Sequence, residues 1–252
     1  MAFLTGTLSA LNGVLADINM PNPLGSTSLI DIDDEHLRQV ALEVAGEGDA
    51  ITRARHVHDY VRDRVRFGFG QHFWRVKASD VLAAGRGHAI PKATLFTAML
   101  RAAGVPARMH FVSVETGLLS GVLEIPMPRH DHAVVEVWLG EQWLACDSFV
   151  VDPVFFEAAC ARLRQEGRHW GYGVHLDGRV EWSGRAPSFS QLVIGGPHAL
   201  PAALDLGVRA DALALYTEEV PEASVLPVVA RLRWRFLARA GNQRIAELLA
   251  GG

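Results

Sequence analysis

Cysteine is scarce in this sequence. Among 252 residues only Cys146 and Cys160 occur, too few for a disulfide framework and typical of a reducing compartment. No apolar run reaches the roughly 18 residues that a membrane-spanning helix needs. Residues 1–14 have no basic start and are interrupted by polar residues, so we expect neither a signal peptide nor an anchor. These absences favour a cytoplasmic protein.

Long runs of one charge are also missing. The 24 basic and 28 acidic residues give a net charge of −4, and no basic stripe stands out, so we expect neither a nucleic-acid partner nor a membrane partner. Hydrophobic residues make up 49% and charged residues 21%, as in an ordinary soluble globular protein. A chain of this length can bury one large core, or one core with a small appendage.

The first half of the sequence shows helical periodicity in three places. Apolar residues recur at helical spacing over about 33–45, 50–65 and 90–103, which predicts three helices with one buried face each. The third helix follows a glycine-rich turn. Pro91 suits its first turn, where a missing N–H costs nothing, and Gly104 suits the position just past its end.

The period then changes toward two. Residues 108–114, 132–139 and 142–151 read as strands, and Gly140-Glu141 between the last two is typical of a type II′ hairpin turn. Farther on, we expect a helix over 155–166, a hairpin over 170–182 with Asp177-Gly178 as its turn, and a helix over 229–249. Helices come first and hairpins follow, so the pattern favours an α+β fold rather than alternating βαβ units.

The register of the first hairpin places two polar residues together. With Gly140 and Glu141 as the loop, Val134 faces Asp147, and alternation puts His132 and Asp147 on one face. As diagonal neighbours they lie about 7–8 Å apart at the backbone, a distance that the two side chains can bridge. Cys146 points to the other face, where we expect it to pack in the core.

The start of the third helix suits a nucleophile. Unpaired N–H groups and the helix dipole stabilise a thiolate at that position and can bind an oxyanion. A cysteine there needs an imidazole nearby, itself oriented by a carboxylate, and His132 with Asp147 offers that pair. The residue at the helix start, however, is Ala89, and alanine cannot attack a carbonyl.

Three separated motifs resemble the transglutaminase-like superfamily, over roughly residues 30–155. They are Gly-Arg-Gly-His-Ala at 85–89 followed by Leu-Arg-Ala-Ala-Gly-Val-Pro-Ala-Arg at 100–108, His-Ala-Val-Val-Glu-Val-Trp at 132–138, and Trp-Leu-Ala-Cys-Asp at 143–147. The resemblance implies a papain-like core, with a central helix on an antiparallel sheet, and a Cys-His-Asp triad at Ala89, His132 and Asp147. The family often has proline after the aspartate, where this sequence has Ser148. Asp152-Pro153 lies at the wrong distance and on the opposite face, so Asp152 is a weaker choice.

Further residues are candidates for the surroundings of such a site. Relatives use a glutamine or tryptophan upstream of the nucleophile to bind the oxyanion, which the resemblance carries to Gln71 or Trp74. For these two residues a packing role over the cleft fits equally well, as core packing does for the aromatic candidates named next. For His88 and Lys92 the alternative is a solvated position on the loop or helix face. Candidates for the substrate pocket are His88, Lys92, Trp170 and Tyr172, with His175 beside them.

Isolated histidines suggest little else. His56 and His58 are two apart on a helix and do not share a face, so we expect them at the surface or half-buried. His130 and His132 have no third ligand at useful spacing, so we expect no metal, and nothing in the sequence calls for a cofactor.

The resemblance implies an enzyme that cleaves or transfers an acyl group of a small molecule or peptide. We expect residues 1–155 to form the core and 156–252 a family-specific extension packed on it. Ala89 has two explanations: a natural cysteine was replaced to inactivate the enzyme, or the protein is a natural pseudoenzyme that binds in the same cleft. We favour replacement, because His132 and Asp147 are still present. Neither hydrolysis nor amide-bond formation with an amine is favoured by the sequence.

Overall fold

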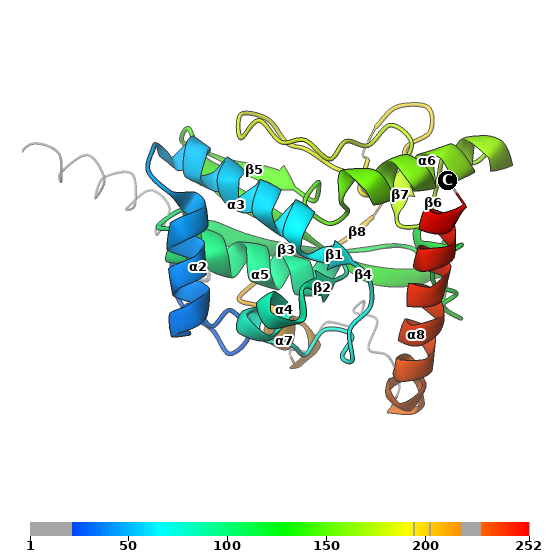
Figure 1. Ribbon diagram of the computed structural model, residues 1–252, viewed down its shortest axis with the longest axis horizontal. Coiled ribbons are helices and arrows are strands. Elements are labelled where there is room, and N and C mark those ends of the chain that lie inside the picture. Colours follow the sequence, from blue (N-terminus) through cyan, green and yellow to red (C-terminus); the bar gives the residue numbers. More distant parts are fainter. Residues whose placement is uncertain (1–21, 194, 202, 218–227, 252) are drawn as a thin grey trace, which may run out of the picture.

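The computed structural model describes residues 22–193, 195–201, 203–217 and 228–251 (Figure 1). The expectation for residues 1–14 lies outside this part of the chain. The helices are α2 (Glu35–Ala45), α3 (Ala50–Arg64), α4 (Ala78–Ala84), α5 (Ala89–Ala102), α6 (Pro153–Glu166), α7 (Ala212–Thr217) and α8 (Val228–Ala250), with a 3₁₀ turn η1 (Thr116–Leu119). The strands are β1 (Arg66–Phe67), β2 (Arg86–Gly87), β3 (Ala107–Glu115), β4 (Arg129–Leu139), β5 (Gln142–Cys146), β6 (Trp170–Gly171), β7 (Val174–His175) and β8 (Leu204–Arg209).

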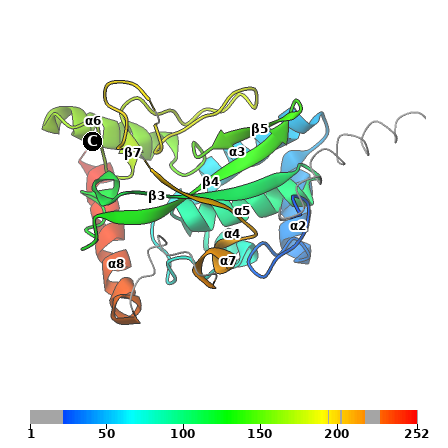
Figure 2. The same ribbon diagram turned by 180° about the vertical axis from the view of Figure 1, so that it is seen from behind.

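The centre of the fold is an antiparallel sheet with α5 laid along one face. Its four strands have the order β5-β4-β3-β8. Figure 1 shows α5 in front of β3 and β4 with α2 and α3 beside it, and Figure 2 shows the strands from the opposite side. The expected α+β, papain-like arrangement is therefore confirmed. α8 stands across the end of the sheet at which β4 begins.

Local sequence explains the helices that cover α5. Asp34 caps α2 by accepting from the Leu37 N–H at 2.8 Å, and Asp49 caps α3 by accepting from the Thr52 N–H at 2.8 Å. Such caps satisfy N–H groups that have no partner inside the helix. Gly46 ends α2 at φ 62°, a left-handed conformation that glycine adopts without strain. All three helices expected in the first half lie within two residues of their predicted bounds.

α5 is buried on nearly every side. Its residues 89–101 are all buried, including polar side chains, because helices pack on one side of it and the sheet on the other. A helix surrounded in this way has no solvent-exposed polar face and is therefore not amphipathic in the usual sense. The position of its first residue is therefore fixed by packing along its whole length.

The hairpin formed by β4 and β5 has the expected register but a different turn. Leu139 pairs with Gln142 and Trp138 with Trp143, as alternation predicted. Both loop residues have positive φ, 58° at Gly140 and 65° at Glu141, which indicates a type I′ turn rather than type II′. The glycine is compatible with both turns, and the twist of the hairpin holds Glu141 in a conformation that glutamate seldom adopts.

The second hairpin turns earlier than expected. β6 and β7 pair Trp170 with His175 and Gly171 with Val174, so the turn is Tyr172-Gly173 and not Asp177-Gly178. Tyr172 has φ 56°, which is costly for a tyrosine. Hydrogen bonds to other segments offset this cost: the Tyr172 N–H donates to the Ser120 carbonyl and the Tyr172 hydroxyl to Glu166. Such tertiary contacts were invisible in the local pattern.

His58 corrects another expectation. It is fully buried on α3, whereas His56 is exposed. His58 follows Ala54 by four residues and precedes Val61 by three, so it lies on the inner face of the helix. Its Nε2 makes a 2.9 Å hydrogen bond with the Ser148 hydroxyl, and its Nδ1 lies 3.0 Å from the Asp59 carboxylate. The burial of this imidazole is therefore satisfied by polar partners.

The segments beyond residue 155 share the main apolar core. Residues of α6, β8, α7 and α8 belong to the same buried cluster as α5 and the sheet, among them Leu163, Leu206, Leu215 and Trp234. β8, which the sequence did not suggest, is an edge strand of the central sheet. Within the described residues, no helix is both long and apolar enough to cross a membrane.

Candidate active site

Ala89 is the first residue of α5. His88 precedes the helix in an extended conformation and offers no side-chain cap, so N–H groups at the start of α5 remain available. The Lys92 N–H bonds the His88 carbonyl and Pro91 has no N–H, which leaves the N–H groups of Ala89 and Ile90 without a partner inside the helix. Ala89 as a whole is 8% exposed.

A glycine allows the chain to reach this helix start. A Cβ added to Gly87 would lie 3.0 Å from the Cγ of Lys92 and 3.2 Å from the Cβ of Pro91. Both distances are shorter than ordinary carbon contacts. Gly87 also ends β2, which pairs in parallel with β1. The glycine of the motif is thus required by close approach of two segments.

His132 and Asp147 form a buried pair. The Nε2 atom of His132 lies 3.1 Å from Oδ2 of Asp147, and the side chains are 1% and 0% exposed. β4 carries the histidine, and the aspartate directly follows β5. The same-face geometry expected from the hairpin register is therefore confirmed.

Asp147 accepts hydrogen bonds from a loop that the sequence did not identify. Its Oδ1 accepts from the N–H of Ser190 at 2.6 Å and of Gln191 at 3.2 Å, and its Oδ2 accepts from the Leu192 N–H at 2.8 Å. The Asp147 N–H in turn donates to the Ser188 carbonyl. These donors are backbone groups, so residue identity gave no signal for them, and together they fix the orientation of the buried carboxylate.

This hydrogen bonding assigns the proton of the neutral His132 ring. An ionised carboxylate only accepts, so Nε2 of His132 is the donor to Asp147. The neutral imidazole then carries no proton on Nδ1, which can accept one. Asp147 therefore fixes both the orientation and the tautomer of His132.

Two further buried histidines, His88 and His130, are electrostatically coupled to His132. His88 and His130 are buried, and burial, together with the charge that His132 can carry, lowers the pKa of each to about 3. Among the described residues, both ring nitrogens of His88 lack a hydrogen-bond partner of good geometry. The same holds for Nδ1 of His130. Both rings are therefore buried and uncharged at neutral pH. No group of three or more potential metal ligands was found in the described part of the chain.

Aromatic rings cover His88. Its ring centroid lies 5.0 Å from that of Phe73, 5.5 Å from Phe69 and 5.9 Å from Trp234. Phe69 and Phe73 belong to the loop before α4, and Trp234 to α8. The sequence had not connected α8 with the site.

α8 also holds the backbone of that loop. Asn242 accepts from the Phe69 N–H at 2.8 Å and donates to the Phe69 carbonyl at 2.9 Å. Trp234 donates from its ring nitrogen to the Gly70 carbonyl at 3.0 Å. The loop beside Ala89 is therefore fixed by three hydrogen bonds from one helix.

The two oxyanion candidates occupy different surroundings. Trp74 stacks on Tyr216 with ring centroids 4.6 Å apart, and Tyr216 donates to the carboxylate of Asp131, the neighbour of His132. Gln71 is exposed and lines a pocket with residues of α8. Trp74 is thus linked by contacts to the strand that carries His132, and no such link is present for Gln71 within the described residues.

The pocket candidates are also spread apart. Lys92 is fully buried, and its ammonium group donates to the Val65 carbonyl at 2.5 Å, so it lies in the core. Burial lowers the Lys92 pKa to about 7. Trp170 packs on the apolar cluster that includes Leu192, beside the loop that holds Asp147. Tyr172 is tied to Glu166 at 2.6 Å, and the His175 ring lies 6.1 Å from that of Trp170.

The remaining alternatives for the site have structural roles. Cys146 is buried in the core, as expected, and burial raises its pKa to about 12. Asp152 caps α6 by accepting from the Phe155 N–H at 2.9 Å. Ser148, which replaces the usual proline, makes hydrogen bonds with His58 and Cys146. Ser148 therefore ties the chain after β5 to α3.

Comparison with known proteins gives one family. The profile of the transglutaminase-like superfamily matches residues 38–148, which include the whole of α5, β4 and Asp147.

No curated protein matches the sequence. Among solved structures, the chain is similar to a candidate cysteine protease from Cytophaga hutchinsonii, with 15% identity and a TM-score of 0.45 over 76% of this chain and 47% of that one. It is also similar to a candidate protease from Parabacteroides distasonis, with 15% identity and a TM-score of 0.34 over 50% of this chain and 26% of that one. The chain spans about half the length of the first of these proteins and a quarter of the second.

Proposed function

Because residues 38–148 belong to the transglutaminase-like superfamily, we propose that the chain carries the site of a thiol acyl-transfer enzyme, with position 89 as the place of the nucleophile. The observation that supports this most is the buried hydrogen bond between His132 and Asp147. A neutral imidazole oriented by an ionised carboxylate is the arrangement that nucleophilic catalysis requires. The expected triad positions are thus residues 89, 132 and 147.

With a cysteine at position 89, the reaction follows from this geometry. Nδ1 of His132 takes the thiol proton, and the thiolate attacks an amide, ester or thioester carbonyl. The tetrahedral intermediate then collapses, and the imidazolium returns the proton to the leaving amine, alcohol or thiol. Water or an amine resolves the acyl-enzyme, which gives hydrolysis in the first case and a new amide bond in the second. The substrate is accordingly an acyl compound, either a small molecule or a peptide.

The start of α5 would supply the electrostatic stabilisation of the thiolate and of the oxyanion. The free N–H groups of Ala89 and Ile90 point out of the helix start, where they stabilise a thiolate and a developing oxyanion. The buried, neutral rings of His88 and His130 keep the surroundings poorly solvated, which strengthens such interactions. Gln71 and Trp74 remain the proposed side-chain donors to the oxyanion.

Alanine at position 89 leaves this chain without a nucleophile. We expect it to form no acyl-enzyme, although the hydrogen-bonded pair of His132 and Asp147 is intact. A buried carboxylate and imidazole cost free energy to desolvate, and binding alone does not require them to be paired. We therefore favour replacement of a cysteine by Ala89, and the alternative is a pseudoenzyme that binds acyl compounds without cleaving them.

The test restores the sulfur. In Ala89→Cys, the rate of iodoacetamide labelling should exceed that of an ordinary thiol at pH 6–7, and it should fall toward the ordinary value when His132→Ala is added. Ala161→Cys, at an exposed position of α6, provides the ordinary thiol for comparison. The background from Cys146 and Cys160 is small, because burial raises the pKa of both thiols.

Two results would count against the proposal. A thiol at position 89 no more reactive than the one at position 161 would remove the nucleophile assignment. Undiminished reactivity in Ala89→Cys/His132→Ala would remove the base assignment. If the thiol is activated, mass spectrometry of products formed with and without added amines separates hydrolysis from aminolysis.

A further inference from the structure

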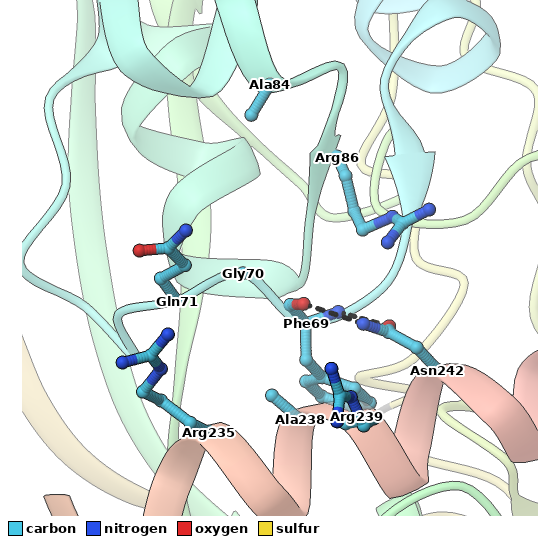
Figure 3. Close-up of a pocket in the computed structure, with 9 residues that line it drawn as sticks. All are labelled: Phe69, Gly70, Gln71, Ala84, Arg86, Arg235, Ala238, Arg239 and Asn242. Atoms are coloured by element: carbon cyan, nitrogen blue, oxygen red, sulfur yellow. Dashed lines mark hydrogen bonds between the residues drawn. The ribbon is translucent and has the colours of Figure 1, made fainter.

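A pocket lined by arginines lies on the outer side of the loop that covers His88. It has a volume of about 490 Å³ and is bounded by the loop before α4, the start of β2 and one face of α8. Figure 3 shows Arg235 and Arg239 reaching it from α8 and Arg86 from the β2 side, with residues 69–71 between them. The other lining residues are Phe69, Gly70, Gln71, Ala84, Ala238 and Asn242.

The charge of this pocket is entirely positive. None of the nine lining residues is acidic, although the chain has a net charge of −4. In the described part of the chain, Arg86, Arg235 and Arg239 form no ion pair, whereas Arg62, Arg108 and Arg168 each contact a carboxylate. Arg235 and Arg239 are also four residues apart on one helix, a spacing at which like charges destabilise the helix. An anion bound between them would relieve that repulsion.

The walls of the pocket are held in place before any ligand binds. The Phe69 and Gly70 backbone is fixed by Asn242 and Trp234 through three hydrogen bonds of 2.8–3.0 Å. The stem of Arg86 passes against Gly68, since a Cβ there would lie 2.9 Å from the Cδ of Arg86. A Cβ at Gly70 would meet nothing within 4 Å, so the pocket is open at that point. Fixed walls reduce the entropy lost on binding.

We propose that this pocket binds a small multivalent oxyanion, namely a phosphate or the carboxylates of a polycarboxylate. Guanidinium groups bind both classes through paired N–H donors, and the Gln71 amide offers a further neutral donor at the rim. The inference does not depend on a thiol at position 89. It places an anion beside the loop whose Phe69 contacts His88, which gives acidic ligands a second point of attachment near the proposed acyl-transfer site.

The test is a titration of the 252-residue chain, with its alanine at position 89, monitored by NMR of ¹⁵N-labelled protein at low ionic strength. Inorganic phosphate and citrate are used in separate titrations. The Gly70 and Gln71 amides and the Trp234 indole N–H should shift together and saturate, with a Kd of about 1 mM or tighter for at least one anion. Saturation by phosphate alone or by citrate alone identifies which class of anion the pocket takes.

Variants locate the site. Arg86→Gln and Arg239→Gln should each weaken binding about tenfold, the usual effect of losing one charge-assisted contact. Arg38→Gln removes the same charge from an exposed position of α2 and should leave the affinity unchanged. The proposal is overturned if neither anion shifts the three signals together with a Kd of about 1 mM or tighter, or if Arg38→Gln weakens binding as much as the pocket variants. The substituted residues Arg38, Arg86 and Arg239 are all exposed, so the variants should fold. An unchanged NMR spectrum away from the pocket checks this.

Discussion

Nε2 of His132 donates to Oδ2 of Asp147 across 3.1 Å, and both side chains are buried. Because this contact occupies Nε2, the ring can act as a base only through Nδ1. Asp147 is fixed in turn by backbone N–H groups of residues 190–192. The hairpin thus carries the proposed base, and a loop more than forty residues later in the sequence holds the carboxylate that orients it.

Removal of the Asp147 carboxylate should strongly destabilise the fold. Asp147→Ala leaves His132 and the N–H groups of three loop residues without their buried acceptor, which predicts a loss of about 3–5 kcal/mol in the free energy of unfolding. Asp205→Ala is the control, because that side chain is 73% exposed and contacts a histidine at the surface. Its loss should cost less than about 1 kcal/mol. Urea denaturation measures both, and equal losses would contradict the assigned role of Asp147.

Protonation of buried histidines should destabilise the protein in acid. The His88 pKa is about 3 in the folded state and about 6.5 when unfolded, so the unfolded chain binds more protons between these values. The free energy of unfolding therefore falls as the pH drops from about 6.5 toward 3, by up to about 1.4 kcal/mol per pH unit. His88→Phe, which keeps a ring among Phe69, Phe73 and Trp234, should remove this contribution.

A histidine of opposite behaviour provides the control. The pKa of His110 is raised, first by its hydrogen bond with Glu136 and further by Asp205. Its contribution to stability is complete below about pH 6.5 and is lost as the pH rises through the folded pKa. His110→Gln should therefore reduce stability more at pH 6 than at pH 8. Urea denaturation across pH 4–8 measures the free energy of unfolding of the unsubstituted protein, His88→Phe and His110→Gln. If this free energy depends on pH in the same way in the unsubstituted protein and in His88→Phe, the prediction for His88 is refuted.

Lys92 should give a second pH dependence in the alkaline range. Burial lowers its folded pKa to about 7, against about 10.4 in the unfolded chain. The unfolded state binds more protons between these values, so stability should rise with pH from about 7 to 10. Lys92→Met should abolish this rise, as unfolding at pH 7, 8.5 and 10 would show. Lys77→Met, at the exposed start of α4, controls for the loss of a lysine. A rise of the same size in Lys92→Met would show that another group causes it.

Periodicity and short-range register predicted the parts of the fold that depend on neighbouring residues. The α5 start at Ala89, the pairing of Trp138 with Trp143 and the meeting of His132 with Asp147 follow from helix punctuation and from strand alternation. These features need only local geometry. Together with the family resemblance, they lead to the proposed triad positions without any knowledge of the remaining chain.

Long-range packing decided what the sequence could not. The turn at Tyr172 is stabilised by groups of η1 and α6, and Ser148 and Asp59 satisfy the ring of His58 on the inner face of α3. The acceptor sites of Asp147 are filled by backbone N–H groups, which every residue except proline carries. The contact of α8 with the site loop likewise joins segments about 170 residues apart. No local pattern marks such contacts.

The attachment of the site loop to α8 leads to a prediction about local stability. Asn242→Ala removes both side-chain hydrogen bonds to the Phe69 backbone, and each is worth about 1 kcal/mol. We expect the free energy of unfolding to fall by about 1–3 kcal/mol. We also expect the substitution to increase amide-proton exchange in the loop around residues 69–71 more than in the centre of α5. Gln243→Ala is the matched control, because the side chain of the adjacent Gln243 on α8 bonds the exposed Glu247 and, among the described residues, no part of the loop. Hydrogen exchange followed by mass spectrometry compares the two variants. Unchanged exchange of the loop in Asn242→Ala would show that Trp234 alone suffices to hold it beside His88, whereas faster exchange confined to that loop would make α8 the element that keeps the wall of the site closed.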